Sequence, residues 1–283
     1  MKITLQKLYY DGIAILEKEN LDNIKNEVIM LIESALNITK VYFLTHPNEV
    51  VDLKDYNIFI QKVKRRARRE PLQYIIGHQA FMGLDFYVNS NVLIPRPETE
   101  ILVEEVLKVI NNKRELNVLD LCTGSGCIAI SLGYYSKLNH IVAVDISKEA
   151  LHVANKNAKQ NNVNITFIKS DLFIDLKEDF LDYFDVIVSN PPYIPKKQIG
   201  KLMIEVKDYE PSLALDGHED GLFFYKEIAK KAKNYLREKG RLFFEIGFDQ
   251  GQSVSDILKK EQYNSINVKK DLAGLDRIVS GRI

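Results

Sequence analysis

The sequence predicts an α/β fold that follows a small helical domain. From residue 117 onward, short runs rich in β-branched residues alternate with longer segments of helical periodicity, as in strands joined by helices. In the first 70 or so residues, apolar residues recur only at helical spacing. The roughly 20 residues between these two parts have the pattern of a β-hairpin. We therefore expect a helical domain over residues 1–71, a hairpin connector over 72–92 and an α/β domain over 93–283.

The helical domain is predicted from three apolar stripes, over residues 5–16, 21–36 and 53–69. Thr39 or Thr45 can cap a short helix between the second and third stripes, and the proline after His46 marks a break there. No combination of residues that suggests catalysis appears in this part. Its expected task is recognition or docking.

The third stripe ends in the one obvious run of charge in the chain. Two interpretations stay open for these cations. They can form a solvated helix face that also suits the carboxyl end of a helix, or they can contact RNA or an acidic partner. The run consists of Lys62, Lys64, Arg65, Arg66, Arg68 and Arg69.

The connector begins after Pro71. Residues 73–76 and 84–88 have the composition of strands, and Gly77 suits a turn after the first of them. A stiff, polar segment over residues 94–100 then leads into a predicted helix that Thr99 or Glu98 can cap. Arg96 lies between two prolines of this segment. Its guanidinium group is equally well explained by a surface salt bridge and by a contact with a ligand.

Seven strands are expected in the α/β domain. Five of them alternate with helices, over residues 118–121, 141–145, 165–168, 184–189 and 241–246. The last two, near residues 266–269 and 277–280, are separated by a turn at Gly274 and predict an antiparallel closing hairpin. Helices are expected over residues 128–132, 148–160 and 253–260.

Composition places the chain among ordinary globular proteins. Its 283 residues are 46% hydrophobic and 28% charged, with 39 basic and 39 acidic residues, so the global charge does not suggest a nucleic-acid partner. Cys122 and Cys127 lie close together and suggest a reducing compartment rather than a disulfide framework. The first residues lack a signal-peptide pattern and no stretch approaches transmembrane length, so the expectation is a cytoplasmic protein away from membranes.

A glycine loop follows the first predicted strand. Gly124 and Gly126 let the backbone approach a ligand at the start of a helix, and Asp145 ends the next strand where an acid accepts from ribose hydroxyls. With Ala129, the loop also fits a dinucleotide fingerprint. The loop alone therefore leaves both a nicotinamide cofactor and S-adenosylmethionine open.

Three further features favour S-adenosylmethionine. Asp120 and Asp171 add polar groups at the same rim, which suit a ligand with an amino-acid end and an adenine end. The closing hairpin leaves no second half-domain for a nicotinamide. The strand that ends at Asn190 is followed by Pro191-Pro192-Tyr193. This end of the strand presents the amide of Asn190, backbone carbonyls that are free to accept hydrogen bonds, and the ring of Tyr193. That set suits methylation of a planar nitrogen.

The chemical reason lies in the delocalised lone pair of an amide or exocyclic amino nitrogen, which makes it a poor nucleophile. The side-chain oxygen of Asn190 and the carbonyl of Pro191 can each accept one of its two N–H bonds and stabilise it as it becomes tetrahedral. Tyr193 can stack on the planar group. Alignment supplies much of the barrier reduction, and no strong general base is required.

The loop from Asp120 to Gly126, Asp145 and the Asn190-Pro191-Pro192-Tyr193 motif resemble those of class I amino-methyltransferases that use S-adenosylmethionine. Further segments resemble the release-factor glutamine methyltransferases of the HemK or PrmC type, and the match extends over essentially the whole chain. These segments cover residues 71–77, 81–84, 94–100, 210–217, 220–222 and 271–277.

The resemblance implies a Rossmann-like seven-stranded class I methyltransferase sheet and a substrate glutamine in the Gly-Gly-Gln motif of peptide chain release factors, gripped with the help of the helical domain. The residues expected to bind the cofactor are Asp120, Cys122, Thr123, Gly124, Ser125, Gly126, Asp145, Asp171, Leu172 and Asn190. Those expected to bind the substrate are Arg96, Asn190, Pro191, Pro192 and Tyr193, and catalysis is expected from Asn190, Pro191 and Tyr193.

One position departs from the family pattern. The glycine loop of the family usually begins with glycine where this chain has Cys122. A backbone contact from residue 122 survives if its conformation does not require a positive φ. After the third strand, Leu172 and Phe173 fall where an apolar wall for adenine is expected, although core packing explains them equally well.

Two alternatives remain at this stage. A DNA or RNA adenine-N6 methyltransferase can use the same motif, but it predicts a target-recognition insert and a basic cleft that the short spacers and zero net charge do not indicate. A non-catalytic module that binds release factors or ribosomes is the other alternative. We expect a monomer with no nucleic-acid substrate, and the histidines show no metal-ligand spacing.

Overall fold

The computed structural model describes residues 2–19, 21–110 and 115–283, and the chain divides into two compact units. The helical unit comprises the residues up to Gly77 together with Ile204–Tyr209, and the α/β unit comprises His78–Met203 and Glu210–Ile283. The domain boundaries at residues 71 and 92 stay a prediction. Each unit has a hydrophobic core of its own.

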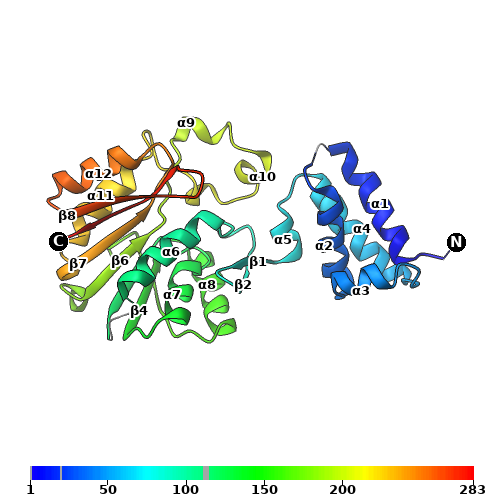
Figure 1. Cartoon of the computed structure of the whole chain (residues 1–283), viewed down its shortest axis with the longest axis horizontal. Helices are drawn as coiled ribbons and strands as arrows, with labels where there is room; N and C mark the ends of the chain where they lie inside the picture. Colours follow the sequence, from blue (N-terminus) through cyan, green and yellow to red (C-terminus); the bar gives the residue numbers. More distant parts are fainter. Residues whose placement is uncertain (1, 20, 111–114) are drawn as a thin grey trace. The chain divides into compact units, whose positions relative to one another are not determined.

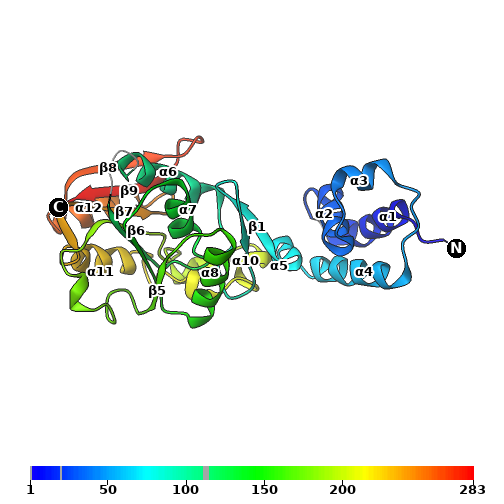
Figure 2. The ribbon, with the colours of Figure 1, turned by 90° about the horizontal axis from the view of Figure 1, so that it is seen from below.

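The helical unit is a bundle around a buried apolar core (Figure 2). Leu8, Val28 and Phe59 are fully buried in it, and the lack of a side chain at Gly12 lets α1 pack directly against Phe59. Thr4, Thr39 and Asp52 cap the helices α1, α3 and α4 through their side-chain oxygens. The helices of this unit are α1 (Leu5–Leu16), α2 (Ile24–Leu36), α3 (Lys40–Thr45), α4 (Leu53–Ala67), α5 (Leu72–Ile76) and α10 (Ile204–Lys207).

Part of the basic run at the end of α4 forms ion pairs within the helical unit. Arg66 is buried and pairs with Glu27 at 2.7 Å and with Glu205 at 3.3 Å, while Arg69 pairs with Glu205 at 2.9 Å. Arg65 pairs with Glu70. Ion pairs therefore account for three of the six cations of the run. The helix itself ends at Ala67 rather than residue 69, because Arg69 takes a positive φ of 69°.

The first part of the connector differs from the expectation. Residues 73–76 form the helix α5 instead of a strand, because the carbonyl of Pro71 accepts from the N–H of Tyr74 and Ile75 and Gly77 ends the turn with a φ of 86°. The hairpin follows it as β1 (His78–Phe81) and β2 (Leu84–Tyr87), which pair antiparallel. Pro71 at the start and Gly77 at the end of this segment therefore favour a helical turn more strongly than its β-branched residues favour a strand.

The α/β unit contains one seven-stranded sheet in the order β5-β4-β3-β6-β7-β9-β8. The first five strands in this order are parallel, and β9 is antiparallel to both β7 and β8, which confirms the predicted closing hairpin. The strands are β3 (Asn117–Leu121), β4 (His140–Asp145), β5 (Thr166–Lys169), β6 (Phe184–Ser189), β7 (Leu236–Glu245), β8 (Asn264–Lys270) and β9 (Asp276–Arg282). The predicted α/β class with a seven-stranded sheet is confirmed.

Helices cover both faces of this sheet (Figure 1). Val118, Val186 and Val188 point to one face and pack with α6 and α7, whereas Leu119 and Ile187 point to the other and pack with α11 and α12. This alternation is the period-two signature of strands that are buried on both faces. The helices are α6 (Pro97–Ile110), α7 (Cys127–Tyr135), α8 (Lys148–Gln160), α9 (Lys196–Ile199), α11 (Phe223–Ala232) and α12 (Gly251–Lys260).

Two helix predictions need correction. Pro97 is the first residue of α6, so Thr99 and Glu98 lie inside the first turn and do not cap it; proline suits this position because its missing N–H has no partner there anyway. The helix α11 was not predicted. Its buried residues Tyr225, Ile228, Ala229 and Ala232 do recur at helical spacing, so a signal was present.

Candidate active site

The candidate site lies where the strand order of the sheet reverses. β3 pairs with β4 on one side and with β6 on the other, and the chain leaves β3 outward through β4 and β5 before it returns to β6. Ligands of open α/β sheets bind in the crevice beyond the carboxyl ends of the strands at this point. Cys122 follows β3, and Asn190 follows β6.

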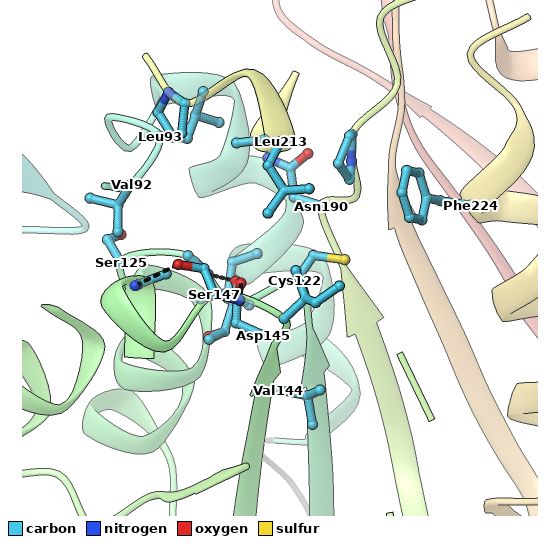
Figure 3. A pocket seen from close by; sticks show the side chains of 18 of the residues that line it. Val92, Leu93, Cys122, Ser125, Val144, Asp145, Ser147, Asn190, Leu213 and Phe224 are labelled. Atoms are coloured by element: carbon cyan, nitrogen blue, oxygen red, sulfur yellow. Dashed lines mark hydrogen bonds between the residues drawn. The ribbon is translucent and has the colours of Figure 1, made fainter. Parts of the chain in front are cut away.

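A cavity of about 390 Å³ opens at this crevice. Its volume falls in the range of small-molecule sites. In Figure 3, Val92, Leu93 and Leu213 lie across the cavity from Asp145 and Ser147. Ten of the residues expected to bind cofactor or substrate line it: Arg96, Cys122, Thr123, Gly124, Ser125, Asp145, Asp171, Leu172, Asn190 and Pro192. Asp120, Gly126, Pro191 and Tyr193 are not among the lining residues.

The glycine loop shapes one wall of the cavity. Gly124 has a φ of 56°, and a side chain built on it would meet no atom within 4 Å, so the backbone there faces open space. Gly126 has a φ of 81°, and a Cβ atom there would lie 2.9 Å from Ile130 and 3.1 Å from Ala154. Gly124 thus leaves room for a ligand, whereas Gly126 permits close packing between α7 and α8.

Asp145 ends β4 and joins two backbone segments at the cavity. Its Oδ2 accepts from the N–H of Gly124 at 2.8 Å, and its Oδ1 accepts from the N–H of Ser147 at 2.9 Å. Burial raises the pKa of this carboxyl group, and the backbone N–H groups of Ser147 and Gly124 oppose the rise. A carboxylate has about four acceptor positions, so Asp145 can still accept from a ligand.

Asp120 stabilises the glycine loop through hydrogen bonds and does not line the cavity. It is fully buried, and its Oδ2 accepts from the hydroxyl of Thr123 at 2.6 Å and from the N–H of Ala129 at 3.3 Å. Burial raises its pKa to about 7. The carboxyl group therefore ties the glycine loop to the first turn of α7.

Cys122 does take a positive φ, of 60°. A residue with a Cβ atom is strained at a positive φ, whereas glycine is not. The backbone contact that a glycine would make at residue 122 is therefore not expected to be kept unchanged by Cys122. Leu172, also on the cavity wall, has a φ of 51°. Burial raises the pKa of the Cys122 thiol, which argues against a thiolate nucleophile here.

The end of β6 is held from three sides. The hydroxyl of Ser189 donates to the carbonyl of Leu121 at 2.8 Å, and the carbonyl of Tyr193 accepts from Nε2 of Gln250 at 3.1 Å. The side-chain nitrogen of Asn190 donates to Oγ1 of Thr99 at 3.3 Å. Pro191 is buried, and no backbone N–H of the described residues donates to its carbonyl. The ring of Tyr193 packs against the core on the α11 side of the sheet.

Arg96 forms an ion pair, whereas the ligand contact predicted as the alternative stays a prediction. It lines the cavity, and its Nη2 pairs with Oε1 of Glu210 at 2.6 Å. The side chain of Glu210 is only 1% exposed, and burial raises its pKa while Arg96 lowers it. This pair fastens the segment that begins at Pro211, which contributes Leu213 to the cavity wall.

Several lining residues escaped the sequence analysis, because apolar residues in loops read as ordinary packing or exposure. Leu213 and Phe223 are 54% and 41% exposed, and Val92 and Leu93 are further apolar residues of the wall. The sequence predicts only a helix cap at Thr99. Among the described residues, no three His, Cys, Asp or Glu side chains are grouped as a metal site would require. None of the helices over the described residues has the length and apolar character needed to cross a membrane.

Two known families match the chain. The methyltransferase small domain matches residues 97–207, and the PrmC N-terminal domain matches residues 8–77. Among solved structures, a methyltransferase from Pyrococcus furiosus superposes with a TM-score of 0.53 at 18% identity, covering 72% of this chain and 90% of the other. A 16S rRNA N2 G1207 methyltransferase from T. thermophilus gives a TM-score of 0.52 at 18% identity, covering 72% and 49%. Fold, cavity and matches together define a methyltransferase of the class I type.

Relatives narrow the assignment. The release factor glutamine methyltransferase of Clostridium botulinum is 38% identical over 281 residues, which is 98% of this chain and 99% of that protein. The enzyme of the same name from Thermodesulfovibrio yellowstonii is 43% identical over 249 residues, 87% of this chain and 88% of that protein. The chain therefore belongs to the release factor glutamine methyltransferase family, as the sequence motifs predicted.

Proposed function

We propose that this chain transfers the methyl group of S-adenosylmethionine to the side-chain amide nitrogen, N5, of the glutamine in the Gly-Gly-Gln motif of peptide chain release factors. The observation that carries the proposal is the position of Asn190. Its amide lines the cavity at the carboxyl end of β6, within about one strand spacing of the glycine loop that follows the neighbouring β3. A methyl donor on the loop and a planar acceptor at Asn190 would meet there.

The residues of the cavity fit the cofactor. Gly124 leaves space where a side chain would intrude, Asp145 keeps acceptor positions for ribose hydroxyls, and Leu172 offers an apolar surface to adenine. Asp171 and Thr123 add polar groups for the remaining parts of the ligand. S-adenosylmethionine supplies a methyl group that its sulfonium centre already activates.

The chain's own residues then act on the acceptor nitrogen. Oδ1 of Asn190 and the carbonyl of Pro191 accept its two N–H bonds, hold it in line with the methyl group and stabilise the positive charge that develops on it. Glu210 holds Arg96 at the cavity, where the guanidinium can donate to carbonyls of the substrate loop. The proton leaves after transfer, when the nitrogen is acidic.

The acceptor is proposed to be protein rather than nucleic acid. Support comes from membership of the family and from the basic run, in which three of the six cations form ion pairs within the helical unit. We also propose that the chain acts in the cytoplasm as a monomer. The two free cysteines, Cys122 and Cys127, agree with a reducing compartment.

A labelled-methyl transfer assay tests the function. The purified chain is incubated with methyl-labelled S-adenosylmethionine and, in parallel, with a release factor, the same factor with Gly-Gly-Gln changed to Gly-Gly-Ala, duplex DNA and ribosomal RNA. Label is expected in the unaltered release factor alone, and mass spectrometry is expected to place it on the glutamine. Label in DNA or RNA without label in the factor would overturn the proposal.

A further inference from the structure

A buried carboxyl group beside Asn190 has no role in the proposed reaction so far. Glu245 is the last residue of β7 and is only 2% exposed. Ser189 pairs with Phe244 in the parallel ladder between β6 and β7, so the next residues, Asn190 and Glu245, lie side by side at the cavity end of the sheet. Oε2 of Glu245 has no hydrogen-bond partner among the described residues. A buried carboxylate oxygen without a partner needs a physical explanation.

Thr99 reaches the same amide from another element. It lies in the first turn of α6, is 2% exposed, and its Oγ1 accepts from Nδ2 of Asn190 at 3.3 Å. A hydroxyl that accepts one hydrogen bond still has its own O–H to donate. Glu245 carries the carboxyl group next to Asn190 in the ladder, and burial raises its pKa while hydrogen bonding with Thr99 and Asn190 opposes that rise.

We propose that Thr99 and Glu245 are positioning residues that fix the orientation of the Asn190 amide, with its nitrogen toward α6 and β7 and its oxygen toward the cavity. This inference rests on the proposed function, because only an amide that presents its oxygen can accept an N–H of the substrate glutamine. The two ends of an amide have almost the same shape, so neighbouring donors and acceptors decide which way it faces.

The charge state of Glu245 sets the strength of this orientation. An ionised carboxylate only accepts, so it favours the amide nitrogen and disfavours the amide oxygen. A protonated carboxyl group can donate to Oδ1 of Asn190 and stabilise the reversed amide, whose NH2 group would then face the cavity and could not accept. The proposed orientation is therefore strongest when Glu245 is ionised.

Burial raises the pKa of Glu245 to about 7, and Glu98 on α6 raises it further. Arg277 on β9 opposes this rise, as do Thr99 and Asn190. Tyr193, Tyr225 and Cys127 also interact electrostatically with the carboxyl group, and burial raises the pKa of each of them, so all three stay neutral near pH 7. The ionised fraction of Glu245 grows as pH rises through about 7, so kcat is expected to rise in the same interval.

The test compares variants of the full chain in glutamine methylation of a release factor, at pH values from 6 to 8.5. Glu245→Gln keeps the shape, removes the negative charge and adds an NH2 group that can donate to Oδ1 of Asn190, so the preference for one orientation of the Asn190 amide is weakened at every pH. It is expected to lower kcat by about tenfold or more, to leave the Kd for S-adenosylhomocysteine nearly unchanged, and to remove the rise of kcat around pH 7. Glu238→Gln, an exposed position at 90% in the same strand, is the matched control.

A second pair of variants keeps the test valid if Glu245→Gln fails to fold. Thr99→Val keeps the shape and removes the hydroxyl, and is expected to lower kcat with little change in Kd, whereas Thr99→Ser restores most of the rate. If folded variants at both positions keep the wild-type kcat and its pH profile, the inference is wrong. Failure of the wild-type chain to methylate glutamine would instead contradict the proposed function, so the two failures are distinguishable.

Discussion

The backbone N–H of Gly124 donates to Oδ2 of Asp145 across 2.8 Å, which joins the glycine loop after β3 to the end of β4. Both groups line the cavity, so this hydrogen bond fixes their relative positions without help from a ligand. Preorganised polar groups bind more tightly because little ordering remains to be done on association. This contact is the basis of the first prediction.

Asp145→Asn is expected to weaken binding of S-adenosylhomocysteine by about 10- to 150-fold, corresponding to the roughly 1.5–3 kcal/mol of a hydrogen bond to a charged group. The amide replaces one acceptor oxygen with a donor, so it cannot accept from Gly124, Ser147 and a ribose together. Titration calorimetry gives the Kd. Asp179→Asn, an exposed carboxylate after β5, is the control, and equal Kd values for the two variants would contradict the prediction.

Asn190→Ala is expected to lower kcat by about 100-fold or more, the scale observed when one group that stabilises charge in the transition state is removed. Because the side chain acts on the acceptor nitrogen, the Kd for S-adenosylhomocysteine should stay within about threefold of the wild-type value. Single-turnover rates and calorimetry measure the two quantities. Asn267→Ala, at an exposed position of β8, is the control, and parallel losses of rate and affinity would argue against the role given to Asn190.

The free energy of unfolding of Cys122→Gly is expected to exceed that of Cys122→Ala by about 1 kcal/mol. At most positions the alanine variant is the more stable one, because glycine makes the unfolded chain more flexible. Both substitutions remove the thiol, but only glycine adopts the φ of 60° at this position without strain. Urea unfolding of both variants gives the difference in the free energy of unfolding. If the alanine variant is the more stable of the two, the strain at residue 122 is absent in solution.

Arg66→Ala is expected to destabilise the chain by an amount at the lower end of about 3–5 kcal/mol, because the change removes the buried partner of Glu27, whereas Glu205 keeps its ion pair with Arg69. Their side chains remain 16% and 12% exposed, which limits the cost. Urea unfolding followed by circular dichroism measures the loss. Lys64→Ala, an exposed neighbour in α4, should change stability by less than about 0.5 kcal/mol, and similar values for both variants would rule out the buried network.

Asp120 predicts a pH dependence of stability. Its pKa is raised from 3.8 to about 7 in the folded chain, so between these pH values the folded state binds more protons than the unfolded state, and stability falls as pH rises. Asp120→Asn removes this titration. The free energy of unfolding of the variant relative to wild type should therefore increase by roughly 3–4 kcal/mol from pH 4 to pH 7. A difference that does not change with pH, in urea unfolding at several pH values, would contradict this.

Much of the architecture follows from local pattern. Alternating and helical periodicities predicted the seven-stranded sheet and most helices, because strands buried on both faces and amphipathic helices leave a strong signature. The errors lie where backbone signals compete. Residues 73–76 have the composition of a strand, yet Pro71 and Gly77 define one helical turn. Thr99 suggested a cap because it precedes an apolar run, but Pro97 begins the helix earlier.

The sequence by itself determined the family and the chemical groups of the site, since the glycine loop, Asp145 and Asn190-Pro191-Pro192-Tyr193 are contiguous motifs whose order along the chain can be read directly. Only the tertiary structure decided how those groups are held. Thr99, Glu245 and Arg96 come from α6, β7 and a loop that are distant from Asn190 in sequence, and their partners are set by strand register and helix packing. The positive φ of Cys122 was equally hidden, because the conformation of a loop residue depends on the segments that close around it.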